Sequence, residues 1–140
     1  MNKLSLSHCS NIGRVTNLNN IHAVDLSHCI KLFLIENIKN VKYLDLSSTH
    51  DVRGIDNLKS VCTLNLANCK NENINKLENF NKLILSDYKY IDKIKSITNI
   101  NTLIINGLKN INKIDHIKFE NINQIDLKNC ARIDSCKILQ

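Results

Sequence analysis

The sequence predicts a solenoid, a chain wound into stacked coils, because one short apolar pattern recurs along almost its whole length. Seven motifs of the Leu-x-Leu kind begin 20, 20, 20, 19, 20 and 22 residues apart. Their first residues are Leu4, Val24, Leu44, Leu64, Leu83, Leu103 and Ile125. The repeat leaves no stretch for a second domain, so residues 1–140 are interpreted as one domain of seven coils.

Each Leu-x-Leu motif is predicted to form one strand of a parallel β-sheet. Successive side chains of a strand point to opposite faces, so Leu44 and Leu46 should point inward while Tyr43 and Asp45 line the outer face. Equivalent leucines of different coils should then meet in a shared interior. The residues predicted to lie side by side there are Leu26, Leu46, Leu66 and Leu85.

The segments between the motifs have a different period, because their apolar residues recur at every third position. The second coil illustrates this with Cys29, Leu32, Ile35, Ile38 and Val41. An α-helical stripe would alternate spacings of three and four, so a steady spacing of three favours a narrow coil with extended or 3₁₀-like backbone on its far side. One such coil buries too little apolar surface to offset its conformational entropy, so the coils must stack.

Two columns of small residues mark the predicted corners of the coil. After each strand stand residues whose thiol or hydroxyl group can bond the backbone of the turn, namely Cys9, Cys29, Thr49, Cys69 and Cys130. Before each strand stand residues of which asparagine tolerates a left-handed backbone, namely Asn20, Asn40, Ser60, Asn79, Asn99 and Asn121. Both columns are interpreted as structural.

Composition narrows the class of protein. Asn, Ile and Lys supply 60 of the 140 residues, a bias typical of an AT-rich genome, and the net charge of +6 divides evenly between the two halves of the chain. A mixed, solvated surface is therefore favoured over a dedicated phosphate-binding face. There is no signal-peptide pattern and no apolar run of membrane-spanning length, which predicts a cytoplasmic protein with reduced cysteines and no membrane partner.

The pattern Asn-Val/Ile-x-x-Leu-x-Leu-x-x-Cys resembles the leucine-rich repeats, specifically a short type of about 20 residues with Cys at the turn that ends the strand. Similar repeats occur in multigene families of large DNA viruses and low-GC protists. The segments 20–29 and 41–47 match most closely, whereas Tyr88 and Leu108 depart at the Cys position. The fourth repeat is one residue short near Asn73, and the sixth gains two residues near Phe119. The resemblance implies a right-handed superhelix whose concave parallel sheet is a binding surface without catalytic residues.

The outward strand positions are the candidate partner-binding residues. They are Asp25, Asp45, Asn65, Ile84, Ile104 and Asp126, together with Tyr43 in the neighbouring column. Ile84 and Ile104 replace polar residues on adjacent coils and should form a small apolar spot, which favours contact with a partner. The alternative is a choice for β-propensity alone. The adjacent Asp25 and Asp45 would repel a phosphate backbone on this face.

The open ends, the convex side and the paired histidines offer further candidate sites. Open ends of a solenoid present bare strand edges, so the carboxyl-terminal end is predicted to pack on another chain or copy through Ile133, Cys136, Ile138 and Leu139. The convex side is predicted to expose apolar side chains at Ile30, Phe33, Leu34 and Tyr90, which fall outside the inward register. The stacked His8 and His28 supply two ligands, which do not make a metal site, and no catalytic or phosphate-loop motif is present. No metal, cofactor or enzymatic activity is predicted.

These observations predict a non-catalytic interaction module that binds another protein through the concave sheet or an open end. The alternative is a basic accessory subunit of a ribonucleoprotein such as a ribosome. Its RNA contacts would be lysines of the convex side, namely Lys39, Lys59, Lys93, Lys95, Lys113 and Lys118. Salt dependence separates the two, because contacts with phosphate weaken steeply as salt rises.

Overall fold

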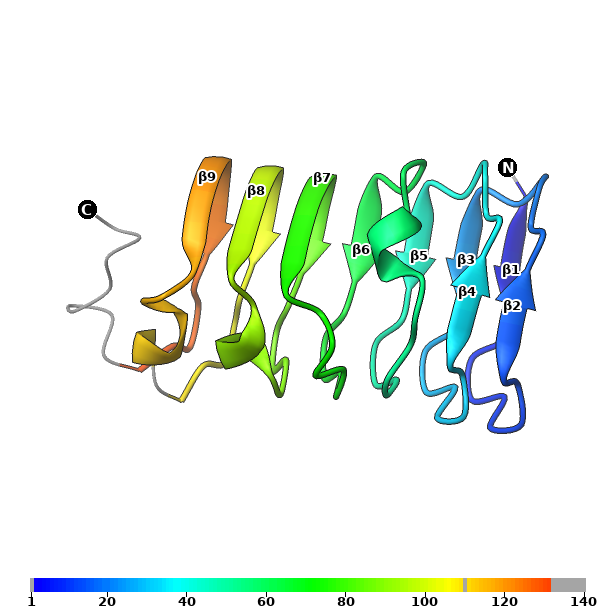
Figure 1. Ribbon diagram of the computed structural model, residues 1–140, viewed down its shortest axis with the longest axis horizontal. Coiled ribbons are helices and arrows are strands. Elements are labelled where there is room, and N and C mark those ends of the chain that lie inside the picture. The colour runs from blue at the N-terminus through cyan, green and yellow to red at the C-terminus, as the bar shows by residue number, and fades with distance from the viewer. Residues whose placement is uncertain (1, 110, 132–140) are drawn as a thin grey trace.

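A computed structural model describes residues 2–109 and 111–131 and places them in a parallel β-solenoid of about six turns. Figure 1 shows the strands in a row along the long axis, with β1 and β9 at opposite ends. The described strands of the main sheet follow the order β1-β3-β5-β6-β7-β8-β9. Each turn consists of one of these strands and the connecting segment that follows it, and the segments are numbered from the first, between β1 and β3. Seven strands enclose six turns, and the predicted seventh coil continues into residues that are not described.

The main sheet contains two kinds of strand. The first four are three residues long and occupy Lys3–Ser5 (β1), Ala23–Asp25 (β3), Tyr43–Asp45 (β5) and Thr63–Asn65 (β6). The last three are nine residues long and occupy Lys76–Ile84 (β7), Ser96–Ile104 (β8) and Lys118–Asp126 (β9). Within this sheet, every described pair of neighbouring strands is parallel, as the repeat predicted.

The connecting segments are extended or 3₁₀-helical, as their spacing of three predicted. In the first two, the strands β2 (Arg14–Thr16) and β4 (Leu34–Glu36) pair in parallel as a second, two-stranded sheet. Short 3₁₀ helices replace them further along the chain, at Ile55–Asn57 (η1), Ile91–Lys93 (η2) and Ile111–Ile114 (η3). Figure 1 shows β2 and β4 in front of the main sheet near the amino-terminal end.

The core is one stack of aliphatic side chains that runs between the sheet and the connecting segments. Leu26, Leu46, Leu66 and Leu85 are all completely buried, and the register aligns the residues two positions before them in neighbouring strands. The prediction of a shared interior is therefore confirmed. Burial at every third position is also confirmed in the second, third and fifth connecting segments, for example at Ile91, Ile94 and Ile97, whereas the fourth segment departs from it because Asn71 is buried and Glu72 is exposed.

The corner before each strand differs from the prediction in the first half of the molecule. Asn79, Asn99 and Asn121 adopt positive φ angles of 66°, 57° and 55°, as expected. Asn20, Asn40 and Ser60 do not adopt positive φ angles. At this corner of the first two segments, the left-handed residues are Asn17 and Asn37 instead. The bend therefore lies one apolar position earlier in these segments, which is possible because an asparagine occupies that earlier position too.

A second left-handed column, which the sequence analysis missed, forms the turn after each strand. Seven residues, one for each strand of the main sheet, have φ between 53° and 80°: His8, His28, Ser48, Asn68, Asp87, Gly107 and Asn129. Asn, Asp, His and Gly are the residue types that most often adopt this conformation. The next position is the column of thiols and hydroxyls, so the turn depends on both columns.

Candidate binding surface

The register of the main sheet brings the predicted partner-facing residues into one row on its outer face. Neighbours in this row are aligned from Ser5 and Asp25 at one end to Ile104 and Asp126 at the other. We call this the outer row, and its members are Ser5, Asp25, Asp45, Asn65, Ile84, Ile104 and Asp126. The predicted neighbourhood is therefore confirmed, while its use in binding stays a prediction.

Most polar members of the outer row close the turn that follows their own strand. Asp25 Oδ1 accepts a hydrogen bond of 2.9 Å from the backbone N–H of Ser27, and Asp45 Oδ1 accepts one of 2.8 Å from Ser47. Asn65 and Asp126 accept equivalent bonds of 3.0 Å from the N–H two residues further on. This is the bond of an Asx turn, so these side chains have a structural task.

The polar members also bond to one another across the strands. Ser5 Oγ donates to Asp25 at 3.4 Å, and both Asn65 Nδ2 (3.2 Å) and the Tyr43 hydroxyl (3.4 Å) donate to Asp45. Desolvation acts to raise the pKa of Asp25, but the hydrogen bonds from Ser27 and Ser5 outweigh it, and the pKa lies below its usual value. Burial, and then the neighbouring Asp45 carboxylate, raise the pKa of Tyr43, whose side chain is 39% exposed.

Ile84 and Ile104 interrupt this polar row. They are aligned on neighbouring strands, half-buried, and have no side-chain acceptor for the turn that follows them. Further along the same turns, Ser86 Oγ accepts a bond of 3.3 Å from the N–H of Asn106, and Asn106 Oδ1 accepts one of 3.0 Å from Lys128. Ile84 and Ile104 thus form an apolar spot between the hydrogen-bonded polar members of the outer row.

The histidine pair is explained by the turn and not by a metal ion. The rings of His8 and His28 stack in parallel, with centroids 4.3 Å apart and an angle of 7° between their planes. Nitrogen lone pairs lie in the ring plane, so the lone pairs of two parallel stacked rings do not converge on one ion. Within residues 2–109 and 111–131, no group of three or more His, Cys, Asp or Glu side chains could hold a metal.

The cysteine column bonds the turns together, as predicted, and it does so between neighbouring coils. Cys29 Sγ donates to the carbonyl of Leu6 at 3.1 Å, and Cys69 Sγ donates to that of Leu46 at 2.9 Å. Burial raises the pKa of both thiols, so they stay protonated at neutral pH. Where the repeat has Tyr88 in place of Cys, the buried hydroxyl donates to the carbonyl of Asn71.

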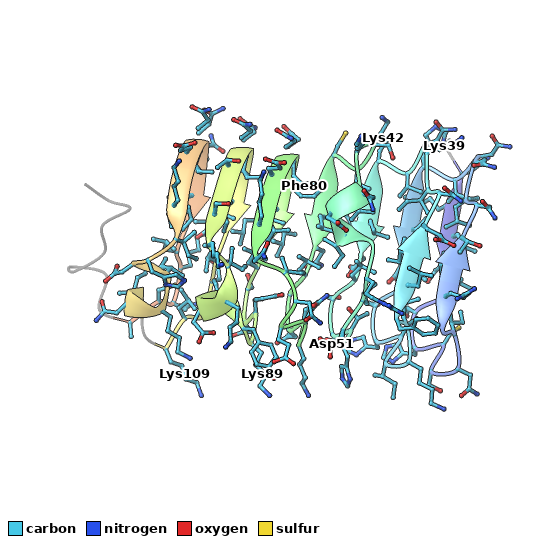
Figure 2. All side chains as sticks on the ribbon, viewed as in Figure 1. Lys39, Lys42, Asp51, Phe80, Lys89 and Lys109 are labelled. Carbon is cyan, nitrogen blue, oxygen red and sulfur yellow. The ribbon has the colours of Figure 1, made fainter. Side chains whose placement is uncertain are left out.

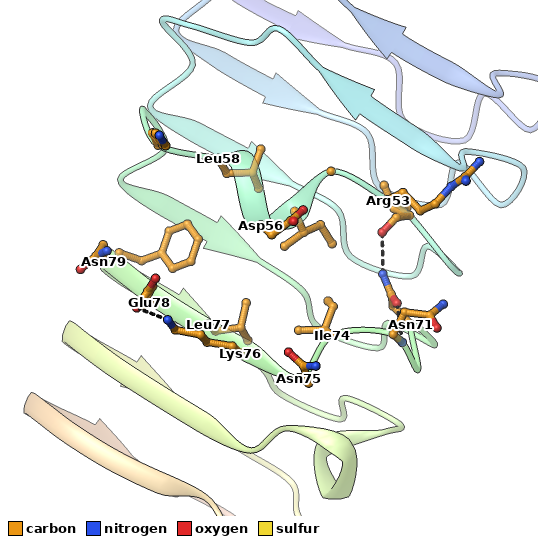
Figure 3. Close-up of a pocket in the computed structure, with 16 residues that line it drawn as sticks. Arg53, Asp56, Leu58, Asn71, Ile74, Asn75, Lys76, Leu77, Glu78 and Asn79 are labelled. Atoms are coloured by element: carbon orange, nitrogen blue, oxygen red, sulfur yellow. Dashed lines mark hydrogen bonds and ion pairs between the residues drawn. The ribbon is translucent and has the colours of Figure 1, made fainter.

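A groove of about 760 Å³ lies between the third connecting segment and the first half of β7. Figure 3 shows Leu58 and Asp56 on one side of it and Lys76, Leu77 and Glu78 on the other. The apolar lining is almost fully buried, and Lys76 and Glu78 form an ion pair at 3.0 Å. The groove marks the coil that is one residue short. The ionisable residues of its lining are Arg53, Asp56, Lys59, Lys76 and Glu78.

The remaining predicted surface residues are spread over the molecule. Ile30 and Phe33 are 48% and 39% exposed, whereas Leu34 and Tyr90 are only half-exposed. Ile133, Cys136, Ile138 and Leu139, predicted to pack the carboxyl-terminal end, lie outside the described residues.

The lysines do not gather on a single face. Figure 2 shows Lys39 and Lys42 at one long edge of the molecule, and Lys89 and Lys109 at the opposite edge. All six lysines of the RNA-binding alternative are exposed, and Lys118 pairs with Glu120 at 2.9 Å. RNA binding through these exposed lysines therefore stays a prediction.

No protein-family model, curated protein or solved structure matches the chain. Among the described residues, no helix is long and apolar enough to cross a membrane. The molecule itself therefore supplies the arguments about function.

Proposed function

We propose that the chain is a non-catalytic protein-interaction module that binds its partner through the outer face of the main sheet, with Ile84 and Ile104 at the centre of the contact. We further propose that its coils are leucine-rich repeats. The Leu-x-Leu strands, the thiol column and the short connecting segments support this second proposal.

The observation that carries the proposal is the loss of the Asx turn at two neighbouring positions. Four polar members of the outer row close their turns with a side-chain oxygen, at 2.8 to 3.0 Å from the N–H. Ile84 and Ile104 lack such an oxygen, and a turn cap of this kind contributes about 1 kcal/mol. Half-exposed isoleucines at these positions gain most when a partner covers them.

The surroundings of Ile84 and Ile104 have the composition of a protein-binding surface. Asn65 lies beside Ile84 and Asp126 beside Ile104, so polar side chains border the apolar pair on both sides along the row. Tyr43, two strands from Ile84, adds an exposed aromatic ring. An apolar centre with a polar rim is the usual arrangement in such contacts.

The test substitutes each isoleucine by asparagine, the residue that closes the equivalent turn at Asn65. Ile84→Asn should keep or increase the free energy of unfolding, because it restores a turn cap. Ile104→Asn should leave the free energy of unfolding nearly unchanged, because the N–H of Asn106 already donates to Ser86 Oγ. Each substitution should reduce the affinity for the partner by at least about tenfold, or about 1.4 kcal/mol, if it removes a central contact. The control is Lys59→Asn, an exposed position of the third connecting segment outside the outer row, which should retain the partner.

The measurement is quantitative capture of proteins from the native source by the immobilised chain, followed by the dissociation constant of the captured protein for each variant. Unchanged affinity in both isoleucine variants would sink the proposal, as would a wild-type chain that retains no protein. Affinity that falls steeply between 50 and about 200 mM salt would indicate a nucleic-acid partner instead.

A further inference from the structure

A second surface of the molecule holds an exposed aromatic ring between two arginines. Phe33 belongs to the second connecting segment, and its backbone N–H donates to the carbonyl of Gly13 at 2.8 Å. Its own carbonyl accepts a bond of 2.9 Å from the N–H of Arg53. Gly13, Phe33 and Arg53 are therefore direct neighbours on three successive coils. We call Arg14, Phe33 and Arg53 the arginine stack.

The ring of Phe33 lies against the backbone of the first segment, where glycine leaves room for it. A Cβ atom added to Gly13 would lie 2.9 Å from Cε1 of Phe33. The ring is nevertheless 39% exposed, and Ile30 on the same segment is 48% exposed. Phe33 therefore packs closely against the first segment and still exposes part of its apolar surface, which a partner can cover.

The two guanidinium groups flank this ring. The Cζ atom of Arg14 lies 5.7 Å from the ring centroid, and that of Arg53 lies 5.8 Å from it. They come from the coils on either side of Phe33, and neither takes part in an ion pair among the described residues. Stacking on the ring restrains both side chains, so less rotamer entropy remains to be lost when a ligand binds.

The choice of arginine is informative in this chain, which favours lysine strongly. Among its 19 basic residues only three are arginines, and two of these three flank Phe33. Arginine differs from lysine in its planar fork, which binds a carboxylate or phosphate in a bidentate manner. Cation–π contact alone is available to both residue types, so the arginines suggest an anionic ligand.

The geometry favours carboxylates of a polypeptide over a nucleic acid. The guanidinium groups of Arg14 and Arg53, which come from the two neighbouring coils, already lie over the ring, where the base of a single strand would have to stack. The exposed Ile30 and the ring edge offer apolar contact instead. The two Cζ atoms cannot be further apart than the sum of their distances to the ring centroid. Carboxylates three residues apart on a polyproline II segment point to the same side and are separated by about 9 Å, which lies within that limit.

We propose that the arginine stack binds an acidic peptide segment of a partner, with carboxylates on Arg14 and Arg53 and an apolar side chain against Phe33 and Ile30. This surface is formed by the connecting segments of the first three coils, whereas the outer row belongs to the main sheet. The proposal is therefore independent of the sheet-face function and can fail without it.

The probe is a fluorescent twelve-residue peptide of four Glu-Leu-Ser units, and fluorescence anisotropy at 0.15 M salt reports its binding to the full chain. Its matched neutral control has Gln in place of Glu, and a twelve-nucleotide uridylate strand represents nucleic acid. We expect the wild-type chain to bind the acidic peptide at least tenfold more tightly than either control, because only that peptide supplies carboxylates and apolar side chains together.

The variants separate the arginine stack from net charge. Arg14→Lys and Arg53→Lys keep the charge but lose the planar guanidinium group. Each should reduce the affinity for the acidic peptide by about threefold to tenfold. Lys93→Ala and Lys113→Ala remove exposed charges from η2 and η3 and should change the affinity for the acidic peptide by less than about twofold. Ile84→Asn should leave it unchanged.

Thermal unfolding of each variant checks that the fold is retained. The proposal is overturned if the wild-type chain binds the acidic peptide no better than its neutral control, or if the lysine-to-alanine variants weaken it as much as the arginine-to-lysine variants. Tighter binding of the uridylate strand would likewise reject it in favour of a nucleic-acid site.

Discussion

The first two coils and the region of β7, β8 and β9 build the same parallel stack from different local structure. The first two have three-residue strands in the main sheet and a second small sheet in their connecting segments. The last three strands are nine residues long and contain a left-handed residue, Asn79, Asn99 or Asn121. The shared element is the spacing of buried residues, and the backbone that achieves it differs.

This difference shows that the left-handed bend before a Leu-x-Leu motif can occur at either of two positions in the repeat. A left-handed residue within a strand shifts the alternation of its side chains, which allows Leu77, Phe80 and Leu83 to be buried at a spacing of three. In the first two segments the bend occurs at Asn17 and Asn37, and the residues before it are free to pair as β2 and β4. The position of a suitable residue therefore selects the local structure, while the core is conserved between the two halves.

The largest expected effect concerns the boundary between these halves, at Gly54. Its φ angle is 99°, and an added Cβ would lie 2.0 Å from the carbonyl oxygen of Ile35 in the neighbouring coil. Gly54→Ala should therefore reduce the free energy of unfolding by about 3 kcal/mol, through backbone strain and the displacement of a coil. Urea-induced unfolding measures this loss.

The matched control for Gly54→Ala is Gly13→Ala, in the first coil. Its Cβ would meet a ring atom of Phe33, which can move, so we expect a loss of about 1 kcal/mol. Equal losses in the two variants would contradict the view that Gly54 sets the boundary between the two kinds of coil.

A smaller effect is expected from Tyr88, which replaces the thiol of the first half at its turn. Its buried hydroxyl donates to the carbonyl of Asn71, so Tyr88→Phe should cost about 1 to 2 kcal/mol at pH 7, by urea-induced unfolding. Burial, followed by the effects of Cys69 and Asp51, raises the pKa of Tyr88 well above its usual value of 10.0.

The raised pKa also predicts how this effect depends on pH. The contribution of Tyr88 to stability is fully present below its unfolded pKa of about 10, and it is lost as the pH rises from there toward the folded pKa, because the unfolded state releases the proton first. The difference in unfolding free energy between wild type and Tyr88→Phe should therefore shrink above pH 10. A difference that grows with pH would show that the pKa of the folded hydroxyl lies below its unfolded value, which would contradict the effect of burial.

The smallest effect separates the two left-handed bends. Asn99 donates to Asn79 at 3.0 Å and accepts from Asn121 at 2.9 Å, which makes an asparagine ladder, whereas Asn17 has only a side-chain contact of 3.5 Å with Thr16. Both Asn99→Ala and Asn17→Ala should lose about 1 kcal/mol to left-handed strain. Asn99→Ala should lose about 0.5 kcal/mol more through the exposed ladder, and equal losses in thermal unfolding would argue against any contribution from it.

The sequence predicted the outer row because strand geometry converts a repeat into a register. Once Leu44 and Leu64 are aligned, Asp45 must lie beside Asn65, and Ile84 beside Ile104. It did not predict the Asx turns of this row, because the sequence alone does not distinguish an outward aspartate that closes a turn from one that contacts a partner. It also missed the left-handed column that includes His8 and His28, although a column of His, Ser, Asn, Asp and Gly was a readable signal of positive φ.

The arginine stack was also beyond the sequence analysis. Phe33 was noted as an apolar residue outside the inward register, but the approach of Arg14 and Arg53 depends on how three coils align at a bend. Side chains outside the strict repeat have no periodic rule that places them. Their neighbours are known only from the packed structure.

By itself, the sequence determined the parallel stack, the buried residues and the outer row, because these follow from two periods that recur in every coil. Only the tertiary structure decided where each coil bends, whether a segment forms β2 or a 3₁₀ helix, and which off-register side chains meet. Asn17 and Asn20 are equally able to adopt a left-handed backbone, so their own chemistry does not distinguish them. The contacts of each coil with its neighbours make that choice.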